Sequence, residues 1–302
     1  MSRLCYADLF QRRDKWGGVV MQKLLVITDL HILAVGQSII GLDPMARFLA
    51  VLQAALAQHG DAEALILMGD LTHTGKPAEY ARLAEVLARV HLPMLCLLGN
   101  HDRRAAFLTA FPQTPVTKSG HVQAVLDLDG HRIITLDTLD GPPYPKGHSA
   151  GLLGSDRLKW LRRALEEADG RIPLVFAHHP PMRIGLPFMD DIRLQDGREM
   201  LALLAAYPGA HLFCGHVHRT VSGSVRGVPF TLFKSPCHQS PLDLMSYDST
   251  LSIDEPGAYG LLLLTKRGVI AHSEDVALPP IRGATGTATS TATSTATGPA
   301  EI

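Results

Sequence analysis

Seven side chains able to ligate metal ions stand in short clusters along the sequence. They are Asp29 and His31, Asp70, Asn100, His178, and His216 and His218. Carboxylate oxygen, amide oxygen and neutral imidazole together suit a borderline divalent ion such as iron, manganese or zinc. Residues two apart on extended backbone point to the same side, so the D-x-H and H-x-H pairs could each reach one ion or two neighbours. Seven ligands exceed the need of one ion, and a pair of ions ~3.5 to 4 Å apart that shares a carboxylate would use them all.

Each cluster follows a run of residues that is typical of a buried strand. The predicted strands are 23–28, 64–68, 94–98, 174–177 and 211–214. In open α/β sheets, ligands bind beyond the carboxyl ends of the strands, so these strands would bring the clusters together. Helices are predicted at 44–58, opened by Asp43-Pro44, and at 77–91, 155–170 and 197–206.

Hairpin signals appear later in the chain. Asp129-Gly130 separates the predicted strands 125–128 and 132–136, and such a pair is a strong hairpin signal. Two further hairpin-like pairs turn at Arg226-Gly227 and Arg267-Gly268, and the folded body closes near residue 275. The sequence therefore predicts an α/β protein in which parallel units give way to antiparallel pairs.

Composition excludes several classes of protein. The chain is 46% hydrophobic and 19% charged, which provides a substantial core and excludes intrinsic disorder. The net charge of -1 gives no positive field for a nucleic acid polymer or an anionic membrane. The apolar runs fall short of the ~18 residues of a membrane span. The four cysteines form no C-x-x-C pair, and residues 1–20 lack a secretory signal, so we expect a reducing, cytoplasmic location.

The two ends of the chain differ from its body. Met21 stands directly before the first convincing strand, so residues 1–20 are either a flexible arm or the product of a start codon placed too early. The Thr/Ala/Ser/Gly-rich C-terminal segment cannot bury enough apolar surface to offset its ordering entropy. We expect one domain over 21–280 and a disordered tail over 281–302.

The ordered clusters together resemble the calcineurin-like metallophosphoesterases. The motifs are Asp29-x-His31, Gly69-Asp70, Gly99-Asn100-His101-Asp102, His178-His179-Pro180 and Gly215-His216-x-His218. Within that superfamily the chain looks most similar to the class III cyclic nucleotide phosphodiesterases and related glycerophosphodiesterases, on Gly69-Asp70-Leu71-Thr72, His178-His179-Pro180-Pro181 and Phe188-Met189-Asp190. The resemblance implies a four-layer α/β/β/α sandwich of two mixed sheets flanked by helices.

The resemblance also implies a dinuclear centre with assigned ligands. One metal would be held by Asp29, His31, Asp70 and His218, and the second by Asp70, Asn100, His178 and His216, with Asp70 bridging. Fe²⁺ or Mn²⁺ is favoured and Zn²⁺ also fits. A hydroxide bridging the two ions would attack phosphorus and convert 3',5'-cyclic nucleotides to 5'-nucleotides.

Other residues are expected to serve the substrate. His101 would contact a phosphate oxygen or protonate the leaving alkoxide, and Asp102 would orient its imidazole. His179 is expected to support a ligand or contact substrate, and His73 to contact substrate. The full expected substrate-contact set is His31, His73, Asp70, Asn100, His101, His179 and His218.

Several functions compete with this prediction. Phosphoprotein phosphatases carry Asp-Arg-Gly and Asn-His-Glu where this chain has Thr72-His73-Thr74-Gly75 and Asn100-His101-Asp102. A nuclease would need a basic channel. A glycerophosphodiester or another small phosphodiester fits the same chemistry, and a non-catalytic scaffold with this fold would be expected to have lost ligands. A small phosphodiester is thus the expected partner, and an edge among the hairpins between residues 221 and 275 could support a homodimer.

Overall fold

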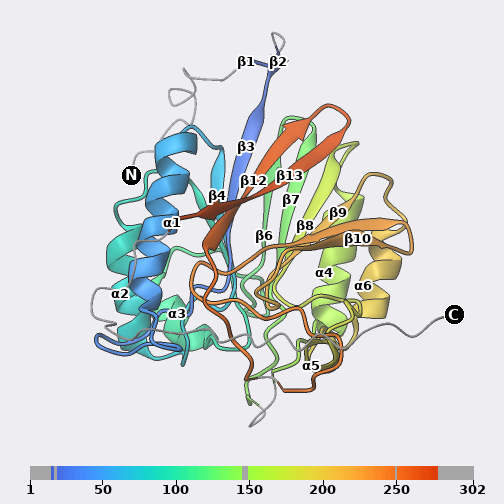
Figure 1. The fold of residues 1–302 in the computed structure, drawn as a ribbon. Coiled ribbons are helices and arrows are strands. Elements are labelled where there is room, and N and C mark those ends of the chain that lie inside the picture. Colours follow the sequence, from blue (N-terminus) through green and yellow to red (C-terminus); the bar gives the residue numbers. More distant parts are fainter. Residues whose placement is uncertain (1–14, 17–18, 145–148, 249, 278–302) are drawn as a thin grey trace, which may run out of the picture.

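The computed structural model describes residues 15–16, 19–144, 149–248 and 250–277. Two sheets lie face to face between two groups of helices (Figure 1). The predicted arm therefore lies largely outside the described residues, and the predicted tail over 281–302 lies wholly outside them. A two-stranded pair, β1 (Lys15–Trp16) and β2 (Val19–Val20), precedes the larger sheets.

The five-stranded sheet has the order β13-β12-β3-β4-β5. Its strands β3 (Gln22–Ile27), β4 (Ala64–Met68) and β5 (Met94–Leu97) run parallel. The hairpin of β12 (Gly257–Thr265) and β13 (Gly268–Val276) adds antiparallel to β3. The predicted turn at Arg267-Gly268 is confirmed, and the sheet is mixed.

The six-stranded sheet has the order β10-β11-β9-β8-β7-β6. Strands β7 (His131–Leu136), β8 (Ile172–Ala177), β9 (His211–Cys214) and β11 (Val228–Leu232) are parallel neighbours. The outer strands β6 (Ala124–Leu128) and β10 (Val221–Val225) pair antiparallel with β7 and β11. Both other predicted hairpins are therefore confirmed.

Alternation along the strands builds the four layers. Leu24 and Val26 of β3 pack with Phe176 of β8 in a core between the sheets, whereas Leu25 and Ile27 of β3 face the helices. Strands buried on both faces are expected to be apolar throughout rather than alternating with polar residues. The predicted α/β/β/α sandwich is confirmed.

The helices cover the outer faces of the sheets. On the first sheet lie α1 (Pro44–His59), α2 (Pro77–Leu87) and α3 (Arg104–Ala110); on the second lie α4 (Gly154–Glu166) and α6 (Gly197–Leu204), and the short α5 (Pro187–Asp191) lies near the strand ends (Figure 1). Asp43 caps α1 by accepting hydrogen bonds from the amides of Met45 and Ala46. Two predicted ends were too late, since α2 ends at Leu87 instead of 91 and α4 at Glu166 instead of 170. At both ends the chain tightens into turns, from Leu87 to Val90 and from Leu165 to Ala168.

No helix among the described residues has both the length and the apolar character needed to cross a bilayer. The cytoplasmic location stays a prediction. The homodimer likewise stays a prediction.

Candidate metal centre

The predicted ligands converge from both sheets. Asp29 and His31 follow β3, Asp70 follows β4 and Asn100 follows β5, while His178 follows β8 and His216 and His218 follow β9. These carboxyl ends lie toward the lower end of the molecule in Figure 1. A direct link joins the sheets there, because the His216 amide donates to both carboxylate oxygens of Asp29 at 3.1 and 3.0 Å. The topology therefore brings the separate clusters into one site.

The backbone at these ligands is left-handed instead of extended. The φ angles are 56° at Asp29, 49° at His31, 46° at Asp70, 68° at His216 and 52° at His218. The prediction that extended backbone aims the D-x-H and H-x-H pairs was therefore wrong. Tight turns aim them, and such conformations cost roughly 1 to 3 kcal/mol per residue unless the surroundings hold them. The His31 amide, for example, donates to the Asp70 carbonyl at 2.9 Å.

One group of donor atoms lies around His31 and His218. Their Nε2 atoms are 2.9 Å apart, and His218 Nε2 is 3.3 Å from Asp29 Oδ1. Two nitrogen ligands ~2.1 Å from one ion and at right angles to each other would stand about 3 Å apart. All three side chains are buried. The spacing therefore fits a shared cation, which would relieve the repulsion between facing nitrogen lone pairs.

The second group contains buried donor atoms without partners. Asn100 Oδ1 and His216 Nε2 accept or donate no hydrogen bond among the described residues, and His178 Nε2 is paired with the Asp70 carboxylate. Unpaired buried polar atoms are costly and call for an explanation such as an ion. Asp70 Oδ2 lies 3.2 Å from His178 Nε2 and 3.7 Å from His31 Nε2, between the two groups. This donor set fits a second cation that shares Asp70 with the first.

Further contacts orient the ligands. His178 Nδ1 lies 3.0 Å from the Met68 carbonyl and His218 Nδ1 lies 2.9 Å from the His238 carbonyl. A carbonyl can only accept, so each Nδ1 carries a proton and each Nε2 is the ring atom that faces the metal position. The Thr28 hydroxyl donates to Asp29 Oδ2 at 2.6 Å.

Glycines make room for the ligands. A Cβ at Gly99 would stand 2.3 Å from Asp70 Oδ1 and 2.6 Å from His178 Nε2. One at Gly69, where φ is +93°, would stand 2.4 Å from His178 Nδ1. Because these distances are far below contact, the Gly-Asp and Gly-Asn steps of the motifs serve packing around the ligands.

The site keeps its carboxylates ionised. Burial alone would raise the pKa of Asp70, but His178 and His101 beside it hold that pKa well below its ordinary value. Burial likewise opposes ionisation of Asp29, and His218 lowers its pKa in turn. Burial lowers the pKa of His216 to about 3, whereas for His178 the lowering by burial is exceeded by Asp70, which raises the pKa to about 9. His216 is thus ready to ligate as neutral imidazole, while His178 must release a proton.

The prediction for Asp102 was wrong in its partner. Its carboxylate accepts hydrogen bonds from the amides of Leu71 and Gly99 at 3.1 and 3.0 Å and from the Tyr80 hydroxyl at 2.8 Å. His101 Nδ1 instead lies 2.7 Å from the carbonyl of His73. Asp102 therefore ties the turn after β4 to the turn after β5. Its carboxylate oxygens are occupied by these donors and do not orient His101.

His179 is built into the wall of the site. It is fully buried, and its Nδ1 and Nε2 lie 2.7 Å from the Thr138 hydroxyl and 3.1 Å from the Ser149 carbonyl. Its ring centroid is 4.8 Å from that of His178 and 4.6 Å from that of His216. These contacts fit the predicted support of a ligand better than contact with substrate.

Sequence reasoning passed over His238. Its ring centroid lies 4.4 Å from that of His218 and 5.4 Å from that of His31. The available signal was β11, whose carboxyl end points to the same edge because it runs parallel to β9. Because β11 was expected only as half of a hairpin and no paired ligand stands beside His238 in the sequence, His238 was expected to be solvated or structural.

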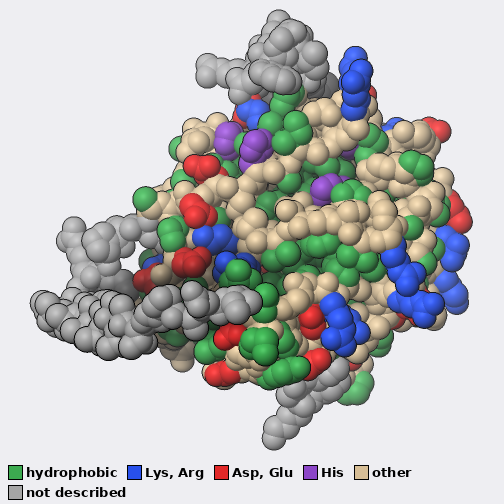
Figure 2. Space-filling model, turned by 45° about the vertical axis from the view of Figure 1, so that its right-hand side comes forward, with side chains coloured by type: hydrophobic (Ala, Val, Ile, Leu, Met, Phe, Trp, Pro, Cys, Tyr) green, Lys and Arg blue, Asp and Glu red, His purple; other side chains and the backbone are tan. Residues whose placement is uncertain are grey.

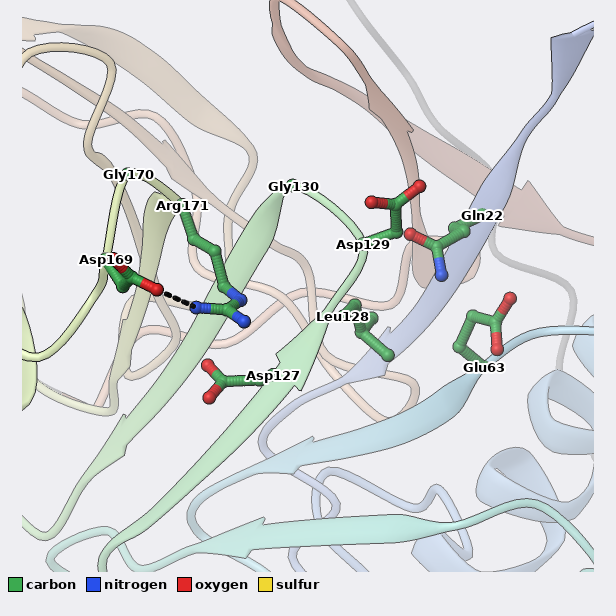
Figure 3. A pocket seen from close by; sticks show the side chains of 9 residues that line it. All are labelled: Gln22, Glu63, Asp127, Leu128, Asp129, Gly130, Asp169, Gly170 and Arg171. Atoms are coloured by element: carbon green, nitrogen blue, oxygen red, sulfur yellow. Dashed lines mark ion pairs between the residues drawn. The ribbon is translucent and has the colours of Figure 1, made fainter. Parts of the chain in front are cut away.

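A separate pocket lies at the opposite ends of the strands. It is bounded by Gln22 at the start of β3, by the β6–β7 turn and by the loop before β8 (Figure 3). Its charged lining is mainly acidic, with Glu63, Asp127, Asp129 and Asp169 against Arg171. This pocket would repel a phosphodiester and is remote from the motifs.

Comparison with known proteins agrees with the motifs. The sequence profile described as calcineurin-like phosphoesterase matches residues 22–220. A probable cyclic nucleotide phosphodiesterase of Rhodopseudomonas palustris is 38% identical over 252 residues, covering 83% of this chain and 91% of the relative. The glycerophosphodiester phosphodiesterase GpdQ of Enterobacter lignolyticus is 31% identical over 183 residues, covering 59% of this chain and 64% of the relative.

A solved structure supports the fold. The purple acid phosphatase PPD1 from yellow lupin (Lupinus luteus) seeds superposes with a TM-score of 0.62 at 14% identity, covering 87% of this chain and 53% of that one. At this identity the likeness concerns the architecture only.

Proposed function

The chain belongs to the calcineurin-like phosphoesterases, a metal-dependent family, and we propose that it hydrolyses 3',5'-cyclic nucleotides such as cAMP and cGMP to 5'-nucleotides. The observation that carries the catalytic part is the pair of donor groups that meet at the Asp70 carboxylate. The substrate class is supported by the name of the relative from Rhodopseudomonas palustris, which the chain covers almost completely.

Two divalent ions are proposed at the site. Fe²⁺ or Mn²⁺ is favoured and Zn²⁺ also suits the donors. One would be held by Asp29, His31, Asp70 and His218, and the other by Asp70, Asn100, His178 and His216. When bound, such ions supply positive charge for a phosphate oxygen and lower the pKa of an attacking water.

His101 is the proposed proton donor to the leaving oxygen. Its amide donates to Asp70 Oδ1 at 2.9 Å, which ties its backbone to the shared carboxylate. Its Nδ1 is engaged by the His73 carbonyl, so Nε2 is the ring atom left to serve the substrate. A protonated imidazole there would neutralise the 3'-alkoxide as the P–O bond breaks.

Metal content and substrate preference test the proposal together. We expect close to two ions per chain after reconstitution with Mn²⁺ or Fe²⁺, hydrolysis of bis(p-nitrophenyl) phosphate in preference to p-nitrophenyl phosphate, and turnover of cAMP. Glu85→Gln removes an exposed carboxylate on α2 and serves as the control variant. It should behave as wild type. A reconstituted protein without metal or activity would restore the scaffold alternative.

A glycerophosphodiester is the second candidate substrate, favoured by the similarity to GpdQ. Hydrolysis of glycerophosphocholine, measured in parallel, decides between the two. A kcat/KM higher for glycerophosphocholine than for cAMP would make a glycerophosphodiester the substrate and leave the proposed reaction type unchanged. A polymeric nucleic acid is disfavoured. On the face shown in Figure 2, Lys and Arg side chains lie in separate groups, the larger toward the right-hand edge, and tan, green and red side chains divide these groups.

A further inference from the structure

The ligand His31 shares one hydrogen bond with a side chain outside the proposed ligand set. His31 Nδ1 lies 3.1 Å from His73 Nδ1. On its other side, His31 Nε2 lies 2.9 Å from His218 Nε2, within the first group of donor atoms. His31 thus stands between the metal position and His73, with one ring nitrogen toward each.

His73 is therefore in a position to set where the proton of His31 resides when a metal is bound. For Nε2 of His31 to offer a lone pair to a metal, its proton must reside on Nδ1. That N–H can then donate to His73 Nδ1, which leaves the proton of His73 on its own Nε2. The corresponding Nδ1 partners of His178 and His218 are main-chain carbonyls, whereas the partner of His31 is a side chain that substitution can remove.

The backbone fixes His73 in this place. Ile32 and Thr72 form a parallel bridge, and the His73 amide donates to the Ile32 carbonyl at 3.1 Å. The His73 carbonyl also lies 2.7 Å from His101 Nδ1, and the two rings stack with centroids 4.9 Å apart. One residue thus contacts both a metal ligand and the proposed proton donor.

We propose that His73 is a positioning residue, whose Nδ1 accepts the proton of His31 and so fixes the tautomer in which His31 binds metal. This role differs from the substrate contact expected from the sequence, and it rests on the proposed function of the same site. Loss of a partner that orients a metal-binding histidine typically lowers metal affinity by about 10- to 100-fold.

Two substitutions of His73 distinguish the effect of its Nδ1 acceptor from the effect of ring stacking. His73→Phe keeps a stacking ring but lacks the acceptor, while His73→Asn provides an amide oxygen near the position of Nδ1. Both retain the main-chain carbonyl that His101 contacts. His211→Phe, a change in another partly buried histidine at the far end of β9, is the matched control.

Titration of metal-free protein with Co²⁺, followed by its visible spectrum and by competition with a chelator, gives a readout besides activity. We expect His73→Phe to lower the affinity for one of the two Co²⁺ ions by about 10- to 100-fold. Affinity should return to near wild type in His73→Asn and be unaltered in His211→Phe. With saturating metal, kcat of His73→Phe should recover and KM should stay close to wild type.

Two outcomes would overturn the proposal in different ways. If wild type binds two Co²⁺ ions and His73→Phe binds both as tightly while KM rises, His73 contacts substrate only. If wild type itself binds no Co²⁺, the proposed function fails, and the role of His73 fails with it.

Discussion

Asp70 is the residue on which both halves of the site depend. One of its carboxylate oxygens lies near His31 and His178, and the other accepts the amide of His101. Asp70→Ala removes these contacts at once, so we expect loss of both ions and of activity by more than about a thousandfold, as for other residues that act as a unit. Metal analysis after reconstitution measures the first effect. Two ions retained per chain would refute the shared carboxylate.

His101 has a role that depends on the leaving group. His101→Ala leaves the metal donors intact, so we expect two ions per chain and a kcat for cAMP lower by roughly 10² to 10⁴. Because p-nitrophenolate needs little help from an acid, the loss with bis(p-nitrophenyl) phosphate should be much smaller. Comparison of kcat for the two substrates checks this. Equal losses would indicate a phosphate contact instead of proton donation.

Residue types were predictable at the site, but their local geometry was not. The predicted ligands gather because their chemistry and their positions after strands are both visible in the sequence. The left-handed backbone at Asp29 and His216 was not visible, since the contacts that hold it come from the other sheet. The partners of Asp102 were missed because Leu71 and Tyr80 stand 31 and 22 residues away in the sequence, although they belong to the same sheet and its helices.

At the scale of elements, long apolar strands were predicted well and short helices poorly. The strands β3, β4, β8 and β9 fall within two residues of their predicted bounds. Helices α3 and α5 were not predicted, since they have seven and five residues and no side-chain cap. Local propensity is weak over such lengths, and packing decides their conformation.

Strand β9 carries a histidine that links its stability to pH. His211 stacks on Phe213 with ring centroids 4.4 Å apart, and its Nε2 lies 3.0 Å from the Thr231 hydroxyl. Burial lowers the pKa of His211 to about 4. Below the unfolded value of about 6.5 the unfolded chain binds a proton that the folded chain refuses, so stability present above that pH is lost as the pH falls toward 4.

Replacement of this histidine should remove that part of the pH dependence. Between pH 6.5 and 4.5 we expect wild type to lose roughly 1 to 2 kcal/mol more unfolding free energy than His211→Gln, after allowance for solvent screening of a partly exposed ring. Urea unfolding of both proteins measures the difference. A chelator is present throughout, so loss of metal does not contribute to it. If the unfolding free energies of the two proteins change equally with pH, burial of the His211 ring does not contribute to the pH dependence.

At the scale of the whole molecule, the sandwich of two sheets was expected from the resemblance to the family. The predicted helices and buried strands agree with it, but by themselves they equally fit a single sheet with helices on both faces. What could not be predicted is which strands become neighbours within each sheet. His238 shows the consequence, since only the parallel pairing of β11 with β9 brings it beside His218.

The metal centre should also stabilise the molecule as a whole. Its donors come from β3, β4 and β5 in one sheet and from β8 and β9 in the other, so ions bound there join the two sheets at one end. A ligand that binds only the folded state stabilises it by about 4 kcal/mol at ~1,000 times its Kd. For a domain of this size each kcal/mol raises Tm by about 2 to 4 °C.

Removal of metal should therefore lower Tm by roughly 10 °C or more. Thermal unfolding of reconstituted protein with and without a chelator measures this, and the shift should be far smaller in Asp70→Ala, which has little metal to lose. The size of the shift depends on the buried charges, because His178 and His218 partly neutralise Asp70 and Asp29 when no ion is bound. A Tm that does not respond to the chelator would mean that this internal pairing alone joins the sheets, and the centre would then serve chemistry without serving stability.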